Sequence, residues 1–207
     1  MAENILFINA CIRGKDVSRT YKLSSFFIKN YISNNKDVVL KEIALEDIQL
    51  NPLNKIDINK RDELVKSDDR ESDLIKFADE FSKADTIIIA APYWDMAFPS
   101  ALKIYIEHVC VCGITFKYEA DGREVGLCRA KKALYITTSG GTITENNYGY
   151  EYVNAIFKFL GIEKTYFLSA ENLDIVGNDA DKIMSDAEKE AEILSEKFWL
   201  KIDFFIF

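Results

Sequence analysis

The sequence predicts an α/β fold, a doubly wound, five-stranded parallel sheet with helices on both faces. Short apolar runs alternate along the 207 residues with segments whose apolar side chains recur at helical spacing, and this alternation is typical of a parallel sheet covered on both sides. The run at 86–91 is almost wholly apolar and rich in β-branched residues, as expected of a buried central strand. The length fits one domain spanning residues 1–207.

The first half of the chain is predicted to hold three strands and three helices. Ser18 is a suitable N-cap, because apolar residues follow it at helical spacing from Leu23 onward. Residues 45–69 are charged and irregular, which indicates a long connection with one short helix, and an amphipathic helix follows it. The expected strands are 5–8, 38–43 and 86–91. The expected helices are one that begins at Ser18, one at 59–66 and one at 69–83.

The second half continues the alternation and adds a small hairpin insertion. Pro99 is well placed to open a helix, Asp121-Gly122 supplies a hairpin turn, and Gly161 follows a helical pattern as its C′ residue. The apolar end of the chain, 198–207, is expected to pack on its own domain or on a partner subunit. The remaining elements are helices from Pro99 to about Val111, from Tyr150 to Leu160 and from Ala180 to about Lys201, a hairpin at 115–127, and strands at 132–138 and 165–169.

Composition argues against several classes of function. The net charge of −8 speaks against nucleic acid as a main partner, because phosphate backbones bind basic faces. No segment has the roughly 20 apolar residues of a membrane span, and no basic leader precedes the first strand, so no membrane association is expected. The cysteines at 11, 110, 112 and 128 lack zinc spacings. We therefore predict no metal site and expect a cytoplasmic protein with reduced thiols.

Five strands whose first loop suits a phosphate favour the flavodoxin-like strand order 2-1-3-4-5, with a ligand where strands one and three end. Three loops then lie side by side. The first, 10–20, leads into a helix whose unpaired N–H groups attract anions. The second, 92–99, is rich in flat side chains suited to a planar ring. The third, 138–145, contains Gly140-Gly141, where the backbone can approach a ligand closely.

A phosphate site beside a surface for a planar ring describes a mononucleotide. FMN fits better than ATP, because the chain has no Gly-x-x-x-x-Gly-Lys-Ser/Thr motif. Taken singly, each feature has an ordinary structural explanation, such as a helix cap at Ser18 or a simple turn at Gly140-Gly141, and only their conjunction favours a ligand. The candidate cofactor-binding residues are Ser18, Arg19, Thr20, Pro92, Tyr93, Trp94, Asp95, Met96, Thr138, Ser139, Gly140 and Gly141.

The motifs Ser18-Arg19-Thr20, Pro92-Tyr93-Trp94-Asp95-Met96 and Ser139-Gly140-Gly141 resemble those of the FMN-dependent NADH-azoreductases, which belong with the NAD(P)H-quinone oxidoreductases of flavodoxin-like fold. Residues 113–118 and 159–162 match as well, so the resemblance spans nearly the whole chain. It implies a homodimer with FMN near the interface. It also implies NADH or NADPH as electron donor and ping-pong transfer of two electrons to a small aromatic acceptor, a quinone or an azo compound.

The resemblance also implies roles for particular residues. Residues 18–20 would hold the phosphate, 93–96 would lie along the isoalloxazine ring, and 138–141 would approach its pyrimidine side. Tyr118, Phe98 and Phe157 are expected in the substrate pocket. No obligatory catalytic side chain is predicted, because the cofactor carries the hydride. The chain departs from the family at Ala10-Cys11, Asp95 and Ile143, where serine, asparagine and histidine are common.

Two other functions stay open on the sequence alone: a flavodoxin-type electron carrier and a non-catalytic flavin- or nucleotide-binding regulatory module. The chain length and the hairpin disfavour the carrier. Cys11 before a helix start also resembles the phosphate loop of low-molecular-weight tyrosine phosphatases. Seven residues separate Cys11 from Arg19, where that loop has five, so we disfavour a phosphatase.

Overall fold

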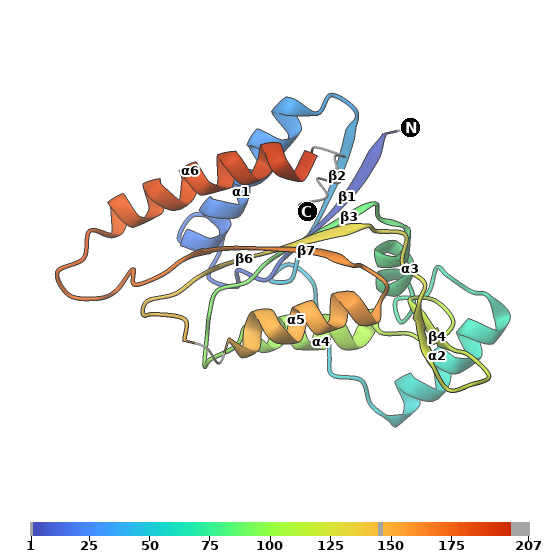
Figure 1. Ribbon diagram of the computed structural model, residues 1–207. Coiled ribbons are helices and arrows are strands. Elements are labelled where there is room, and N and C mark those ends of the chain that lie inside the picture. The colour runs from blue at the N-terminus through green and yellow to red at the C-terminus, as the bar shows by residue number, and fades with distance from the viewer. Residues whose placement is uncertain (1, 145–146, 200–207) are drawn as a thin grey trace.

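The computed structural model describes residues 2–144 and 147–199, apart from the side chain of Trp199. It has three layers, with a sheet between two layers of helices (Figure 1). The five parallel strands lie in the order β2-β1-β3-β6-β7, which confirms the predicted order 2-1-3-4-5. The strands are β1 (Glu3–Asn9), β2 (Val38–Ala44), β3 (Thr86–Ala90), β6 (Lys132–Thr138) and β7 (Lys164–Ala170).

Two apolar cores hold the layers together, one on each face of the sheet. Helices α1 (Arg19–Asn34) and α6 (Ala180–Trp199) enclose the first core (Figure 1). The second core lies under α3 (Lys76–Lys83), α4 (Ser100–Val109) and α5 (Tyr148–Phe159). All five residues of β3 are buried between the two cores, which confirms the prediction of a central strand covered on both faces.

The connection between β2 and β3 differs from the prediction. Helix α2 (Lys55–Ser67) is longer than the expected 59–66, because Asn54 and Asp57 form a capping box that starts it earlier. Helix α3 begins at Lys76 and not at residue 69. Asp68 takes a left-handed conformation that ends α2, and the N–H groups of Ile75 and Lys76 bond to the Ser72 carbonyl, so turns occupy the space between the helices.

The predicted hairpin is present as β4 (Phe116–Tyr118) and β5 (Glu124–Gly126). Its base touches the end of α5, where Gly161 has a φ of 91° and closes the helix as predicted. A Cβ atom on Gly126 would lie 2.1 Å from the backbone nitrogen of Gly161. The hairpin therefore packs backbone against backbone on the helix end, and this contact requires glycine at 126.

A cluster of polar side chains lies at the end of the sheet where the parallel strands begin. The carboxylate of Glu3 accepts hydrogen bonds from Tyr31 (2.7 Å) and Thr86 and pairs with Lys132 at 3.2 Å. Burial alone would raise the pKa of Glu3, but these hydrogen bonds and the Lys132 charge outweigh it and lower that pKa below its ordinary value. Every charge in the cluster has a partner, so it stabilises the fold and offers nothing to a ligand.

The same cluster anchors the end of α6. Lys132 Nζ donates to the Phe198 carbonyl at 2.8 Å and lies 4.4 Å from the centre of its ring. Phe198 itself is buried against Tyr31 and Phe27. Its packing on its own domain fits the prediction for the apolar end of the chain, whose last residues, 200–207, lie outside the described residues. No helix within the described part of the chain is both long and apolar enough to cross a membrane.

We expect Gly126→Ala to lower the free energy of unfolding by about 2–3 kcal/mol, because the added methyl group must push the hairpin off α5. Gly141→Ala is the matched control, since a Cβ atom there meets nothing within 4 Å, and its effect should stay within about 0.5 kcal/mol. Urea denaturation measures both. Equal midpoints for the two variants would contradict the proposed contact.

We expect Glu3→Gln to cost about 1–2 kcal/mol at neutral pH through its weakened hydrogen bonds. The folded pKa of Glu3 is lowered from an ordinary 4.5. The stability that the carboxylate contributes is therefore fully present above that pH and disappears as the pH falls through the folded pKa. The difference in the free energy of unfolding between wild type and variant should be constant from pH 5 to pH 7 and should become smaller below pH 4.5. The exposed residue Glu63, changed to Gln, provides the control, and a gap that widens in acid would refute this account.

Candidate functional site

The loops that follow β1, β3 and β6 meet at one edge of the sheet, as predicted. The N–H of Ala10 donates to the Ala90 carbonyl at 2.8 Å, and the N–H of Tyr93 donates to the Thr138 carbonyl at 3.0 Å. The hydroxyl groups of Thr20 and Thr138 share a hydrogen bond of 2.7 Å, which joins the start of α1 to the third loop. The three loops therefore form one continuous rim.

The first loop ends in an anion cradle at the start of α1. Ser18 is the N-cap, as predicted, and its hydroxyl accepts the N–H of Tyr21 at 3.2 Å. Within the described residues, the N–H groups of Arg19 and Thr20 bond to no other group. Such unpaired N–H groups at the positive end of a helix favour a phosphate. The structure thus brings Ser18, Arg19 and Thr20 together in a form that suits this ligand.

Cys11 lies in the same loop but is not available as a nucleophile. Its side chain is buried, and burial raises the pKa of the thiol to about 11. The thiol therefore keeps its proton at neutral pH, whereas a nucleophilic cysteine must be a thiolate. This environment agrees with the loop length in disfavouring phosphatase chemistry.

The second loop turns sharply at residues 94–97. Trp94 and Ala97 exchange both backbone hydrogen bonds, at 3.3 and 2.7 Å. Asp95 and Met96 have φ values of 50° and 65°, the positive pair that a type I′ turn requires. Positive φ is costly for residues with a side chain and is concentrated at functional sites. The turn exposes Trp94, Asp95 and Met96, while Pro92 and Tyr93 stay half-buried beneath them.

The third loop contains N–H groups that are left without a partner in the described part of the chain. The carbonyl groups of Ser139, Gly140 and Gly141 accept hydrogen bonds from the backbone of residues 172–174, and the Ser139 hydroxyl donates to the Gly141 carbonyl. The N–H groups of Gly140, Gly141 and Thr142 have no partner among the residues the structure describes. These donors suit the polar edge of a ring that gains negative charge.

A fourth loop, after β7, reaches the site and was not predicted. Asp174 pairs with Arg19 at 2.7 Å and donates its N–H to the Gly140 carbonyl at 2.9 Å. A Cβ atom on Gly140 would lie 2.5 Å from the Asp174 carboxylate, so a larger residue there would displace the Asp174 side chain. The signal in the sequence was the position of this loop, at the same edge as the other three.

The three predicted pocket residues lie in different surroundings. Tyr118 lies exposed on the hairpin. Phe98 is half-buried and packs against Tyr152 with their ring centres 5.8 Å apart. Phe157 has no exposed surface and belongs to the core beneath α5. Its assignment to a substrate pocket is therefore corrected to a core position, because the helical stripe of α5 turns this side chain toward the sheet.

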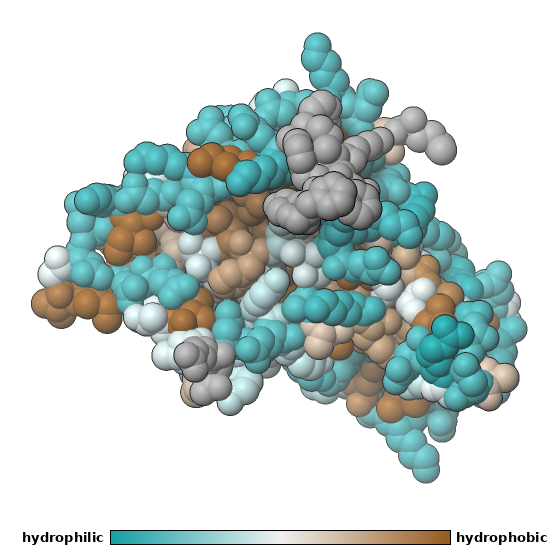
Figure 2. All heavy atoms as spheres, in the orientation of Figure 1, coloured by the Kyte–Doolittle hydropathy of each residue, from teal (hydrophilic) through white to brown (hydrophobic). Residues whose placement is uncertain are grey.

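Exposed apolar side chains surround the rim. Trp94 and Met96 belong to the second loop, and Ile175 and Val176 to the loop after β7. Val176 is fully exposed, and Figure 2 shows the tip of that loop as an apolar projection on a largely hydrophilic face. These exposed apolar groups are available for contact with a ligand or another protein.

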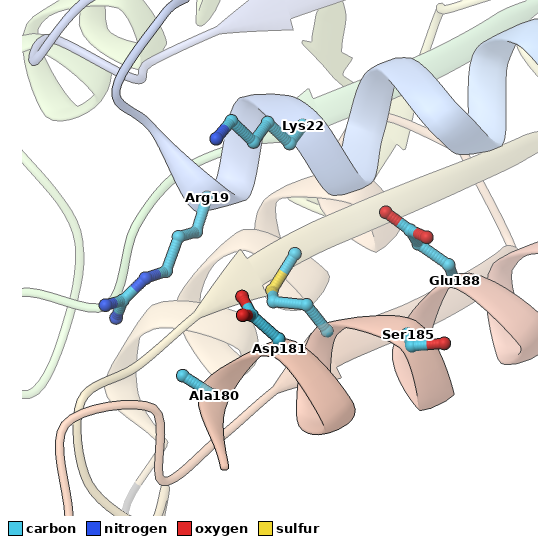
Figure 3. Close-up of a pocket in the computed structure, with 7 residues that line it drawn as sticks. Arg19, Lys22, Ala180, Asp181, Ser185 and Glu188 are labelled. Carbon is cyan, nitrogen blue, oxygen red and sulfur yellow. The ribbon is translucent and has the colours of Figure 1, made fainter.

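Two hollows flank the rim, and each includes one residue of the first loop. One lies between α1 and α6, has a volume of about 320 Å³ and includes Arg19 (Figure 3). The other lies between the end of β2 and α3, has a volume of about 410 Å³ and includes Lys15. The hollowed surface therefore extends beyond the three loops on both sides of the rim.

The rim provides hydrogen-bond donors and apolar surfaces, with little acid–base chemistry. His108 lies away from it, buried in α4 with its Nε2 atom 3.0 Å from the Asn51 carbonyl, so it is a packing residue. In the described part of the chain, no three His, Cys, Asp or Glu side chains cluster as a metal site. The free N–H groups at 19–20 fit the phosphate of FMN. The exposed second loop fits its ring, and the free N–H groups at 140–142 fit the polar edge of that ring.

Comparison with known sequences identifies the family. Residues 3–194 match a family described by its flavodoxin-like fold. The chain is 35% identical over 199 residues to the FMN-dependent NADH:quinone oxidoreductase of Coprothermobacter proteolyticus, an alignment that covers 94% of this chain and 98% of that protein. It is 36% identical over 203 residues to FMN-dependent NADH:quinone oxidoreductase 2 of Clostridium acetobutylicum, with the same coverage.

Solved structures share the fold. An azoreductase from Bacillus anthracis str. Sterne superposes with a TM-score of 0.82 at 22% identity, covers 95% of this chain and 100% of its own, and bears on the fold alone. An FMN-dependent NADH-azoreductase from Bacillus anthracis str. Ames Ancestor, solved in complex with FMN, gives a TM-score of 0.80 at 25% identity, with 95% and 99% coverage. The chain therefore belongs to the family of FMN-dependent NADH:quinone oxidoreductases, within the flavodoxin-like fold.

Proposed function

We propose that this protein is an FMN-dependent NADH:quinone oxidoreductase that also reduces azo compounds. The observation that carries the proposal is that the unpaired backbone N–H groups of the rim match the phosphate and the polar ring edge of FMN. Three neighbouring loops each offer what one part of FMN needs, in a chain whose relatives are named for that cofactor. When bound, FMN would supply the chemistry of hydride transfer from NADH and of two-electron transfer to the acceptor.

The residues of the chain bind and orient. Ser18 and the free N–H groups of Arg19 and Thr20 would hold the phosphate, with the Arg19 side chain adding a positive charge and the buried Thr20 hydroxyl fixing the start of α1 to Thr138. Trp94 and Met96 would cover one face of the ring. The N–H groups at 140–142 would face its pyrimidine side and favour the form that carries negative charge. The assignment of these side chains to FMN rests on their positions around the rim.

Several finer points belong to the same proposal. Donor and acceptor would use one pocket in turn, in a ping-pong order, and NADPH could replace NADH as donor. The protein would act in the cytoplasm as a homodimer. The exposed apolar residues around the rim, among them Val176, support a second copy close to the site, because a partner subunit would cover them and complete the walls of the pocket.

We expect Trp94→Ala to weaken FMN binding about tenfold, because stacking of a large aromatic side chain contributes about 1–1.5 kcal/mol. Fluorescence titration of the apoprotein measures this affinity. Ile56→Ala, on the exposed side of α2 and away from the rim, is the control and should leave it unchanged. An unaltered affinity in Trp94→Ala would remove this residue from the flavin site.

We expect the reaction to separate into two half-reactions. Under anaerobic conditions, stopped-flow mixing with NADH should bleach the visible absorbance of the bound flavin without any other protein. A later addition of quinone should restore it. A flavodoxin-type carrier or a regulatory module would bind the flavin without being bleached by NADH, and that result would reject the proposed enzyme.

A further inference from the structure

The hollow between α1 and α6 continues the cofactor site sideways. Two side chains of α1, Arg19 and Lys22, form one wall, and the first turns of α6 form the other. Arg19 belongs both to this hollow and to the anion cradle, because it is the first residue of α1. A ligand in the hollow would therefore lie directly beside the phosphate of the flavin.

Charge is distributed along the hollow in a definite order. Figure 3 shows Arg19 and Lys22 extending toward the end that faces the loops, while the carboxylates of Asp181 and Glu188 rise from α6 toward α1. Met184 lines the hollow between these two acids and is half-buried. The basic groups thus lie next to the rim, and the acidic groups with an apolar surface lie further along α6.

These polar groups have few partners in the chain. Arg19 uses one nitrogen for Asp174, which leaves its other donors free. The side chains of Lys22, Asp181 and Glu188 form no hydrogen bond or ion pair within the part of the chain that the structure describes, although the backbone N–H of Lys22 donates to the Ser18 carbonyl. A hollow of about 320 Å³ is also within the usual range for small-ligand sites.

We propose that this hollow binds an adenosine phosphate moiety, the adenylate half of NADH, while the nicotinamide lies on the flavin. This inference rests on the proposed function. Arg19 and Lys22 would meet the phosphates. The carboxylates of Asp181 and Glu188 would accept hydrogen bonds from the ribose hydroxyl groups, as acidic residues do in other dinucleotide sites. The sulfur of Met184 would lie against the adenine ring.

The same acids would select the donor. A 2′-phosphate placed on the ribose would face two carboxylates, and like charges at close range repel strongly. The hollow therefore favours NADH over NADPH. An adenylate moiety is also part of FAD, which would bring it into the hollow from the flavin phosphate, and the experiment separates these two sources.

The test uses FMN-loaded protein and the double variant Asp181→Ala, Glu188→Ala. A double variant of the exposed α6 residues Glu190 and Glu192, both changed to Ala, is the control for removing two charges from this helix. Calorimetry with AMP and with ADP-ribose reports binding without turnover, and both should bind about tenfold more weakly to the first variant only. The KM for NADH should rise by a similar factor, and the KM for reduced nicotinamide mononucleotide, which lacks the adenylate, should not change. The efficiency with NADPH should rise.

The other outcomes are equally informative. If FAD, and not NADH, loses affinity in the variant, the hollow serves the adenylate of a flavin dinucleotide. AMP binding that is equal in wild type, variant and control would overturn the proposal, whatever the enzyme does with NADH. Absence of NADH oxidation with normal AMP binding would instead reject the proposed function and leave the hollow as an adenylate site. If the Ala variant unfolds, Asp181→Asn with Glu188→Gln keeps the shapes and removes the charges.

Discussion

The parallel register of β1, β3 and β6 is the constraint on which the site depends. Asn9 pairs with Ala90, and Ala90 pairs with Ile136, so the three strands reach the same level before their chains leave the sheet. Since β3 is buried on both faces, a polar side chain along it needs a buried partner, as Thr86 has in Glu3, and groups left free for a ligand can lie only beyond its end. The loops therefore collect at one edge, where the backbone hydrogen bonds between them replace those of the sheet.

The two edges of the sheet treat their polar groups in opposite ways. Where the strands begin, the carboxylate of Glu3 is surrounded by donors and a cation, and the Lys132 ammonium group also holds the end of α6. Where they end, N–H groups at the start of α1 and in the Gly140-Gly141 loop stay unpaired within the described residues. A satisfied network stabilises a fold, whereas unpaired donors at a rim provide affinity for something else.

Sequence reasoning found the features that local chemistry determines. A Ser18 cap, a buried run at 86–91 and a glycine at 161 each follow from backbone rules, and each is present. Sequence reasoning missed contacts between residues that lie far apart in the chain. Asp174 is 155 residues from Arg19, and no local pattern announces their pairing. Phe157 was misplaced because an aromatic side chain on an amphipathic helix can face the core or a pocket, and only the packing of α5 decides between them.

The turn at residues 94–97 also has a consequence for the evolution of this protein. Asp95 and Met96 occupy a backbone region that costs on the order of 1–3 kcal/mol for residues other than glycine. Glycine at either position would relieve that cost, yet it would remove a side chain from the ligand-facing surface and increase the entropy of the unfolded chain. Selection for stability thus opposes selection for side chains that face the ligand on a rigid turn at these two positions. The core must supply the surplus stability that allows the strained pair to persist.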